Sequence, residues 1–250
     1  MNPADFLAEF KKERASAILR TNDTDNARKA MNAAVEGGFR IVEFTFSIPN
    51  VLELIREFSE RDGVIVGAGT VVTREEAEQA AEAGASFLVS PVVDAEVIKA
   101  AGELGVAMMP GCATPTEMLQ AHRLGAQLQK LFPGQALGPM WVKQTLGPLP
   151  FLNIVPTSGV DLENAADYLK VGSFAVGFVN SLFAPEEIAA ERFDVIRERA
   201  EAMIQAVGVG GVKGGRNSPR SGGFCGSNST GMRQHRGCET SGRSVEHCSA

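Results

Sequence analysis

The chain has 250 residues, an apolar content of 44% and a formal net charge of −6. Residues 208–250 carry 6 basic and 2 acidic side chains, which leaves 18 basic and 28 acidic side chains in residues 1–207. The excess of negative charge in residues 1–207 argues against nucleic acid or an anionic membrane as the main partner. No stretch approaches the roughly 18 apolar residues that a membrane span needs, and no signal-peptide pattern opens the chain, so we expect a cytoplasmic protein.

Residues 1–14 predict an amphipathic helix with Phe6, Leu7 and Phe10 on one side. Residues 15–207 then alternate short apolar runs with helical periodicity, over a length that suits one domain with a substantial core. The runs are typical of buried strands and lie at 16–20, 39–46, 64–67, 86–89, 106–109, 127–132, 151–156 and 173–177. Helices are expected at 24–36, 51–61, 73–83, 94–104, 114–124, 139–146, 161–170 and 185–207.

Local signals mark where these units begin and end. Thr73 with Glu76 predicts a capping box at one helix start, and Gly105 is placed to end a helix just before the next strand. Eight strand-helix units with short connections predict an α/β fold, a single-domain (β/α)8 TIM barrel. An open doubly wound sheet is the alternative, but it normally carries a glycine-rich turn after its first strand, and residues 19–22 contain no glycine.

The segment 208–250 differs from the rest of the chain, because it is rich in glycine, serine and arginine and poor in large apolar residues. Such a composition predicts disorder. Its cysteines and histidines match no ordinary zinc spacing, so we expect no metal site there.

Polar and special residues follow the predicted strands at their carboxyl ends, which is where barrels of this type carry their chemistry. They are Arg20, Glu43, Gly67-Ala68-Gly69-Thr70, Ser90-Pro91, Pro110-Gly111, Lys130 and Thr157-Ser158-Gly159. We therefore expect one site at this end of the barrel.

Lys130 closes an apolar run and is followed within four residues by a proline-glycine stop, Pro133-Gly134. An ammonium group in such a place loses hydration, which favours the neutral, nucleophilic amine. Lys130 is therefore a candidate nucleophile, and the alternative is a structural lysine held in a salt bridge.

Glu43 lies in the strand predicted at 39–46, where alternation puts Ile41, Glu43 and Thr45 on one face and bulky side chains on the other. The bulky face suits the helix layer, so Glu43 should point into the barrel. A carboxylate and an amine inside one barrel suggest a Schiff-base pair, in which Lys130 attacks a carbonyl and Glu43 moves protons. A buried ion pair without chemistry is the alternative.

Other residues at this end predict substrate binding. Arg20 could bind a carboxylate or a phosphate, or it could form a salt bridge with an acid such as Glu43 at the rim of the barrel. Thr70, after Gly67-Ala68-Gly69, could donate a hydrogen bond to a ligand, and that turn could equally be a plain strand-to-helix corner. Thr157-Ser158-Gly159 follows the seventh strand, where such barrels often hold phosphate.

These motifs together resemble the 2-keto-3-deoxy-6-phosphogluconate (KDPG) / 4-hydroxy-2-oxoglutarate (KHG) aldolases. The resemblance spans about residues 15–207. It rests on Ala17-Ile18-Leu19-Arg20, Val42-Glu43-Phe44-Thr45, Gly67-Ala68-Gly69-Thr70-Val71, Val89-Ser90-Pro91, Met109-Pro110-Gly111, Lys130-Leu131-Phe132-Pro133 and Pro156-Thr157-Ser158-Gly159. It implies a class I aldolase on a (β/α)8 barrel, usually a homotrimer, that needs no metal or other cofactor.

The same resemblance implies roles for single residues. Lys130 would form the Schiff base, Glu43 would transfer protons, and Thr70, Pro91 and Phe132 would line the pocket. The partner would be a keto acid. KDPG would give pyruvate and glyceraldehyde 3-phosphate, and KHG would give pyruvate and glyoxylate.

The chain departs from the family pattern at three places. An arginine that some members carry after the glutamate is absent from Phe46-Ser47-Ile48-Pro49, so Arg20 would serve in its place. The family's Gly-Gly pair after the seventh strand is Ser158-Gly159 here. The last phosphate loop reads Val179-Asn180-Ser181. These changes favour either a substrate without phosphate or phosphate binding through Ser158, Asn180 and Ser181. They also leave open a barrel that binds a metabolite without turnover, whereas a phosphate-binding isomerase would not need Lys130.

Overall fold

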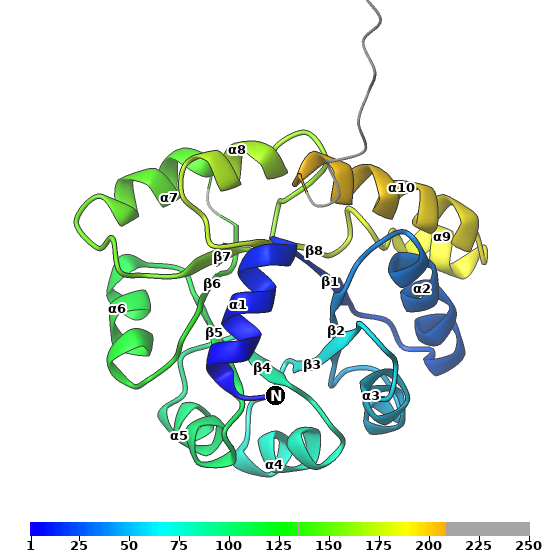
Figure 1. Ribbon diagram of the computed structural model, residues 1–250, viewed down its shortest axis with the longest axis horizontal. Coiled ribbons are helices and arrows are strands. Elements are labelled where there is room, and N and C mark those ends of the chain that lie inside the picture. Colours follow the sequence, from blue (N-terminus) through cyan, green and yellow to red (C-terminus); the bar gives the residue numbers. More distant parts are fainter. Residues whose placement is uncertain (135, 209–250) are drawn as a thin grey trace, which may run out of the picture. The chain divides into compact units, whose positions relative to one another are not determined.

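Eight parallel strands form one sheet in the order β7-β6-β5-β4-β3-β2-β1-β8, with helices around its outside (Figure 1). The computed structural model describes residues 1–134 and 136–208. The strands are β1 (Ala15–Leu19), β2 (Ile41–Thr45), β3 (Ile65–Gly69), β4 (Phe87–Ser90), β5 (Ala107–Cys112), β6 (Gln129–Leu131), β7 (Ile154–Pro156) and β8 (Val176–Phe178). The helices are α1 (Pro3–Glu13), α2 (Thr24–Glu36), α3 (Val51–Ser59), α4 (Arg74–Glu82), α5 (Ala95–Leu104), α6 (Pro115–Arg123), α7 (Pro139–Leu146), α8 (Ala165–Lys170), α9 (Pro185–Ala189) and α10 (Phe193–Ala206).

The sheet curves round until its two edge strands, β7 and β8, are neighbours (Figure 1). The backbone N–H of Phe174, just before β8, donates to the carbonyl of Ile154 in β7 at 2.8 Å, which links the two edges. The predicted (β/α)8 TIM barrel is thus confirmed, and the open doubly wound alternative is wrong. The tail predicted to be disordered, 208–250, lies outside the described residues except for Gly208.

Most predicted helix boundaries agree with the structure, but the last predicted helix, 185–207, was wrong as a single element. It is divided into α9 and α10, and Glu191 between them has φ 53°, a left-handed value. The helix predicted at 161–170 begins only at Ala165, because Asp161 accepts the N–H groups of Glu163 and Asn164 in a turn that precedes it.

Local interactions account for the helix ends. The Thr73 hydroxyl accepts the Glu76 N–H while the Glu76 carboxylate accepts the Thr73 N–H, which confirms the predicted capping box. Gly105 ends α5 with φ 68°, a conformation that costs glycine little and other residues more. In residues 1–134 and 136–208, no helix is long and apolar enough to cross a membrane.

The barrel has two apolar layers that meet the two faces of each strand. The outer layer lies between strands and helices and includes Val42 and Phe44 of β2. The inner layer fills the barrel and consists of Ile41, Phe87, Val89, Ala107, Met109, Leu128, Val155 and Ala175, with Phe6 and Phe10 of α1 added. The alternation predicted for β2, with Ile41 inward, is therefore observed.

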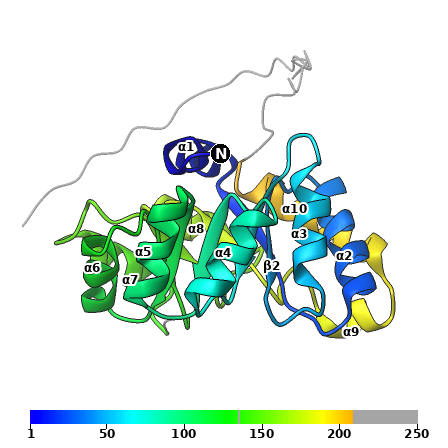
Figure 2. The ribbon, with the colours of Figure 1, turned by 90° about the horizontal axis from the view of Figure 1, so that it is seen from below.

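Helix α1 lies across one end of the barrel (Figures 1 and 2). Phe6 stacks on Phe87 of β4 with ring centroids 4.6 Å apart, and Phe10 meets the ring edge of Phe174 at 6.1 Å. Both α1 rings are fully buried. These rings cover the end at which the strands begin, opposite the end where the strands finish.

Three amides join the short strands β6 and β7 to their neighbours. The Gln127 side chain accepts the Met108 N–H at 2.9 Å, and the Gln129 side chain accepts the Asn153 N–H at 3.0 Å. The Asn153 side chain donates to the Gln127 carbonyl at 2.9 Å. These bonds explain why glutamines face the helix side of an apolar run, a pattern that the sequence left unexplained.

Removing an aromatic ring that fills the end of the barrel should destabilise the whole fold. Phe6→Ala leaves a cavity in the inner layer, and we expect it to lower the free energy of unfolding by about 3–5 kcal/mol in urea titrations. The matched control is Phe151→Ala, because this ring is half exposed and should contribute about 1 kcal/mol or less. Equal losses for the two variants would contradict a sealing role for α1.

Candidate active site

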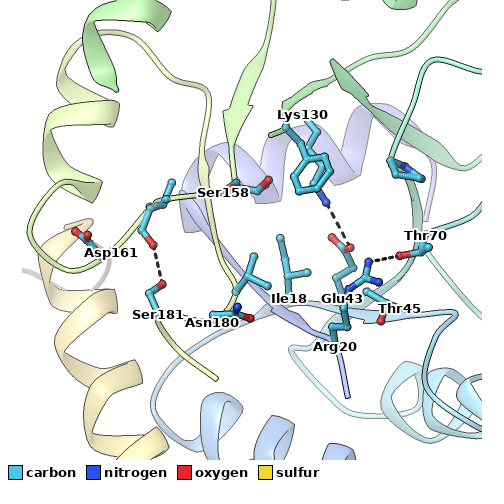
Figure 3. A pocket seen from close by; sticks show the side chains of 16 residues that line it. Ile18, Arg20, Glu43, Thr45, Thr70, Lys130, Ser158, Asp161, Asn180 and Ser181 are labelled. Carbon is cyan, nitrogen blue, oxygen red and sulfur yellow. Dashed lines mark hydrogen bonds and ion pairs between the residues drawn. The ribbon is translucent and has the colours of Figure 1, made fainter. Parts of the chain in front are cut away.

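A cavity of about 510 Å³ opens at the end of the barrel where the strands finish (Figure 3). The eleven residues to which the sequence assigned catalysis or substrate binding line it: Arg20, Glu43, Thr70, Pro91, Lys130, Phe132, Thr157, Ser158, Gly159, Asn180 and Ser181. The other strand-end residues expected at the site are not part of the lining: Gly67, Ala68, Gly69, Ser90, Pro110 and Gly111. The eleven lining residues come from every strand end except that of β5, and the barrel brings them together because parallel strands finish at the same end. Their roles in binding and catalysis stay predictions.

Lys130 and Glu43 face each other across the cavity (Figure 3). Lys130 Nζ lies 3.9 Å from Glu43 Oε1, and the side-chain exposures are 12% and 1%. Lys130 is the middle residue of β6 and shares the inward face with Leu128. Its Nζ also lies 5.4 Å from the centre of the Phe132 ring, which leaves the amine in a largely dry place open to the cavity on one side.

The Glu43 carboxylate is fully buried, and neither of its oxygens has a hydrogen-bond partner in the structure. Burial raises the pKa of Glu43 above its ordinary value of 4.5, while the positive charges of Lys130 and Arg20 act against that rise. At 3.9 Å the contact to Lys130 is an ion pair longer than a hydrogen bond. A buried carboxyl without fixed partners is suited to taking up and returning a proton.

Arg20 and Thr70 meet beside Glu43 (Figure 3). Arg20 Nη2 donates to Thr70 Oγ1 at 2.9 Å, so the guanidinium is held at the rim after β1. Thr70 has φ 61°, an unusual conformation for a β-branched residue. The rim salt bridge to Glu43 considered for Arg20 is not the contact seen, and the remaining donors of the guanidinium are placed to hold an anion.

The opposite wall carries neutral polar groups from the ends of β7 and β8 (Figure 3). Ser181 Oγ donates to the Val160 carbonyl at 2.7 Å, and Thr157 Oγ1 lies 3.5 Å from the Leu131 carbonyl. Among the described residues that line the cavity, the cations are Arg20 and Lys130, and both lie on the Glu43 side. The cavity thus has its cations at one end, and hydrogen-bonding groups together with the Asp161 carboxylate at the other.

Sequence reasoning missed five lining residues: Ile18, Thr45, Val160, Asp161 and Val179. Alternation could have found two of them, because Ile18 and Thr45 share strand faces with Arg20 and Glu43. Asp161 was read only as a helix start. Its carboxylate does accept two backbone N–H groups there, so its place beside the cavity had no separate signal.

Cys112 is the thiol in the described part of the chain, at the end of β5. Burial raises the pKa of this thiol to about 12, so it stays protonated and unreactive at neutral pH. Within residues 1–134 and 136–208 no three histidine, cysteine, aspartate or glutamate side chains come together as metal ligands would.

Comparison with known proteins points to one family. A family model described as KDPG and KHG aldolase matches residues 7–199. A probable 2-dehydro-3-deoxy-6-phosphogalactonate aldolase of Rhizobium meliloti is 35% identical over 76% of this chain and 89% of its own. A 2-dehydro-3-deoxy-phosphogluconate aldolase of Treponema pallidum is 32% identical over 78% and 94%. The structure of a Legionella pneumophila KDPG aldolase with pyruvate as a covalent carbinolamine has a TM-score of 0.71, with 25% identity over 79% and 97%.

The burial of Glu43 predicts a pH dependence of stability that Glu43→Gln should remove. Because the folded pKa is raised above 4.5, the folded protein keeps the proton over a range in which the unfolded chain has lost it. The free energy of unfolding of the unchanged protein should fall as pH rises from about 4.5 upward, by up to roughly 1.4 kcal/mol per pH unit. Relative to it, Glu43→Gln should gain stability over this range in urea titrations.

Glu187→Gln is the matched control. Hydrogen bonds from Arg199 lower the pKa of Glu187, so its contribution to stability is present above the ordinary value and is lost as pH falls. Relative to the unchanged protein, Glu187→Gln should therefore lose stability as pH rises. A slope of the same sign for both variants would show that the pKa of Glu43 is not raised.

Proposed function

Because this chain belongs to the KDPG and KHG aldolase family, we propose that it cleaves a 2-keto-3-deoxy acid between C3 and C4 through a Schiff base on Lys130. The observation that carries the proposal is the pair of Lys130 Nζ and Glu43 Oε1, 3.9 Å apart and largely buried at the floor of an open cavity. A barrel that only binds a metabolite needs neither a buried amine nor an unpartnered carboxylate beside it.

The reaction begins when the neutral amine of Lys130 attacks the C2 ketone of the substrate. Loss of water from the carbinolamine leaves an iminium ion, whose positive charge draws electrons from the neighbouring carbons. The position of Lys130 supports this step, because its side chain lines the cavity and its Nζ lies 3.9 Å from Glu43 Oε1. Arg20, held by Thr70, binds the C1 carboxylate and so fixes the ketone near Nζ.

Glu43 then takes the proton of the C4 hydroxyl, directly or through a water molecule, as the C3–C4 bond breaks. The bonding electrons move into the iminium and give an enamine of pyruvate, and the aldehyde leaves. Glu43 returns a proton to C3, and water hydrolyses the resulting iminium to free pyruvate and Lys130. A raised pKa suits this cycle, because the carboxyl must be a base in one step and an acid in the next.

The far part of the substrate lies against Thr157, Ser158, Gly159, Asn180 and Ser181, while Pro91 and Phe132 bound the cavity near the amine. KDPG would release glyceraldehyde 3-phosphate, as would its galactonate counterpart, and KHG would release glyoxylate. The active unit that we propose is a homotrimer, which light scattering of the purified protein would test.

Trapping with pyruvate tests the lysine. Pyruvate and borohydride should fix a stable mass adduct on Lys130, located by peptide mapping, because reduction makes the C–N bond permanent. Lys130→Ala should give no adduct and lose cleavage by several orders of magnitude. Lys143→Ala, which changes an exposed lysine of α7, should behave as the unchanged protein. An adduct on another lysine, or none, would leave the metabolite-binding barrel as the better description.

The absence of a cation from the described lining residues around Val179 predicts the response to phosphate. Val179→Gly removes a side chain from the cavity wall and lets backbone N–H groups approach a phosphate. One added charge-assisted hydrogen bond is about 1.5 kcal/mol, so kcat/KM for KDPG should rise about tenfold. KHG has no phosphate, and its kcat/KM should change little. An unchanged ratio of the two kcat/KM values would show that Val179 does not limit phosphate binding.

A further inference from the structure

Gly69, the last residue of β3, lies against the carboxylate of Glu43. A β-carbon built on Gly69 would fall 2.0 Å from Glu43 Oε1, 2.8 Å from Cδ and 3.0 Å from Cγ. The register explains the contact, because Thr45 of β2 pairs with Gly69 of β3 and Glu43 lies two residues earlier on the same face as Thr45. The carboxylate therefore occupies the space that any side chain at position 69 would fill.

Backbone conformation does not account for this glycine. Gly69 is not among the glycines with positive φ, whereas its neighbour Thr70 has φ 61° and is not a glycine. Thr70, which has the left-handed backbone, thus bears a branched side chain, whereas Gly69, which does not have that conformation, bears no side chain. What position 69 requires is room and not conformational freedom.

The neighbours of Gly69 differ from those of Gly111 and Gly134, two other tightly packed glycines. The three nearest atoms to a β-carbon at position 69 all belong to the Glu43 side chain. At Gly111 and Gly134 the nearest atoms are backbone atoms of Pro91 and Ser158, which cannot move without the loop that carries them. A methyl group at position 69 would therefore displace a carboxylate rather than disturb the barrel.

We propose that Gly69 is a positioning residue for the reaction: its bare α-carbon lets the Glu43 carboxylate rest against β3, at the distance from Lys130 at which it can exchange protons with a substrate held on the amine. The inference rests on the proposed function. The charged groups that face this carboxylate are Lys130 on β6 and Arg20 after β1, and the cavity wall also includes Asp161. Because no side chain at position 69 occupies the space on the β3 side, the Glu43 carboxylate is not displaced toward Lys130 or Arg20.

The first experiment separates positioning from Schiff-base formation. With pyruvate, Gly69→Ala should still give the borohydride adduct on Lys130, because the amine is unchanged. Exchange of the pyruvate methyl protons for deuterium, followed by NMR, should slow about 100-fold, since a displacement of about 1 Å can cost this much. Its control is Gly102→Ala on α5, where a β-carbon meets nothing within 4 Å, and exchange should be unchanged.

The pH profile of deuterium exchange adds a readout that a purely structural role would not move. In Gly69→Ala the carboxylate is pushed toward Lys130 and Arg20, which favour its charged form, so the acidic limb of the profile should shift to lower pH. The proposal would be overturned if Gly69→Ala exchanged deuterium as fast as the unchanged protein and the acidic limb of its pH profile stayed at the same pH.

The second experiment is a double-mutant cycle of stability. Gly69→Ala should lower the midpoint of urea unfolding in the unchanged protein but not in Glu43→Ala, which lacks the atoms that the methyl group would meet. An equal loss in both backgrounds would overturn the proposal, because Gly69 would then serve the backbone. If pyruvate gives no adduct on Lys130 in the unchanged protein, the proposed function fails, whereas this cycle still decides whether Gly69 makes room for Glu43.

Discussion

The burial of the Glu43 carboxylate beside Lys130 is the constraint around which this barrel is arranged. A carboxylate with no hydrogen-bond partner inside a protein is costly, and the fold supplies one nearby ammonium and a bare glycine in place of fixed donors. Thr70 holds Arg20 through a hydrogen bond of 2.9 Å. The positive charge of Arg20 nevertheless favours the charged form of the Glu43 carboxyl group. The result is a buried carboxyl group with two cations near it and no hydrogen bond to either.

The apolar layers make this arrangement possible because they close every other route into the barrel. The rings of Phe6 and Phe10 fill one end, and the inner side chains of β2 to β8 occupy the middle. Water and substrate can reach the interior at the carboxyl ends of the strands. The cations of the lining, Arg20 and Lys130, lie on the Glu43 side of that opening, whereas Asp161 lies on the opposite side.

The sequence was sufficient for the barrel and for the place of the site, because both follow from periodicity. Alternation placed Glu43 inward, and the common direction of parallel strands placed Arg20, Thr70 and Ser158 at one opening. Features that depend on contacts between distant segments could not be predicted. Nothing local marks the break at Glu191, which lacks the usual glycine or proline, and the role of Gly69 depends on how β2 pairs with β3.

The way α1 is docked bears on how the molecule is made. Phe6 and Phe10 precede every strand of the barrel in the chain, yet their partners Phe87 and Phe174 belong to the middle and the last part of the barrel. Such long separations along the chain delay folding, since the loop between the partners must close first. A nascent chain therefore exposes an aromatic helix until nearly the whole barrel has been synthesised, which is a surface that chaperones recognise.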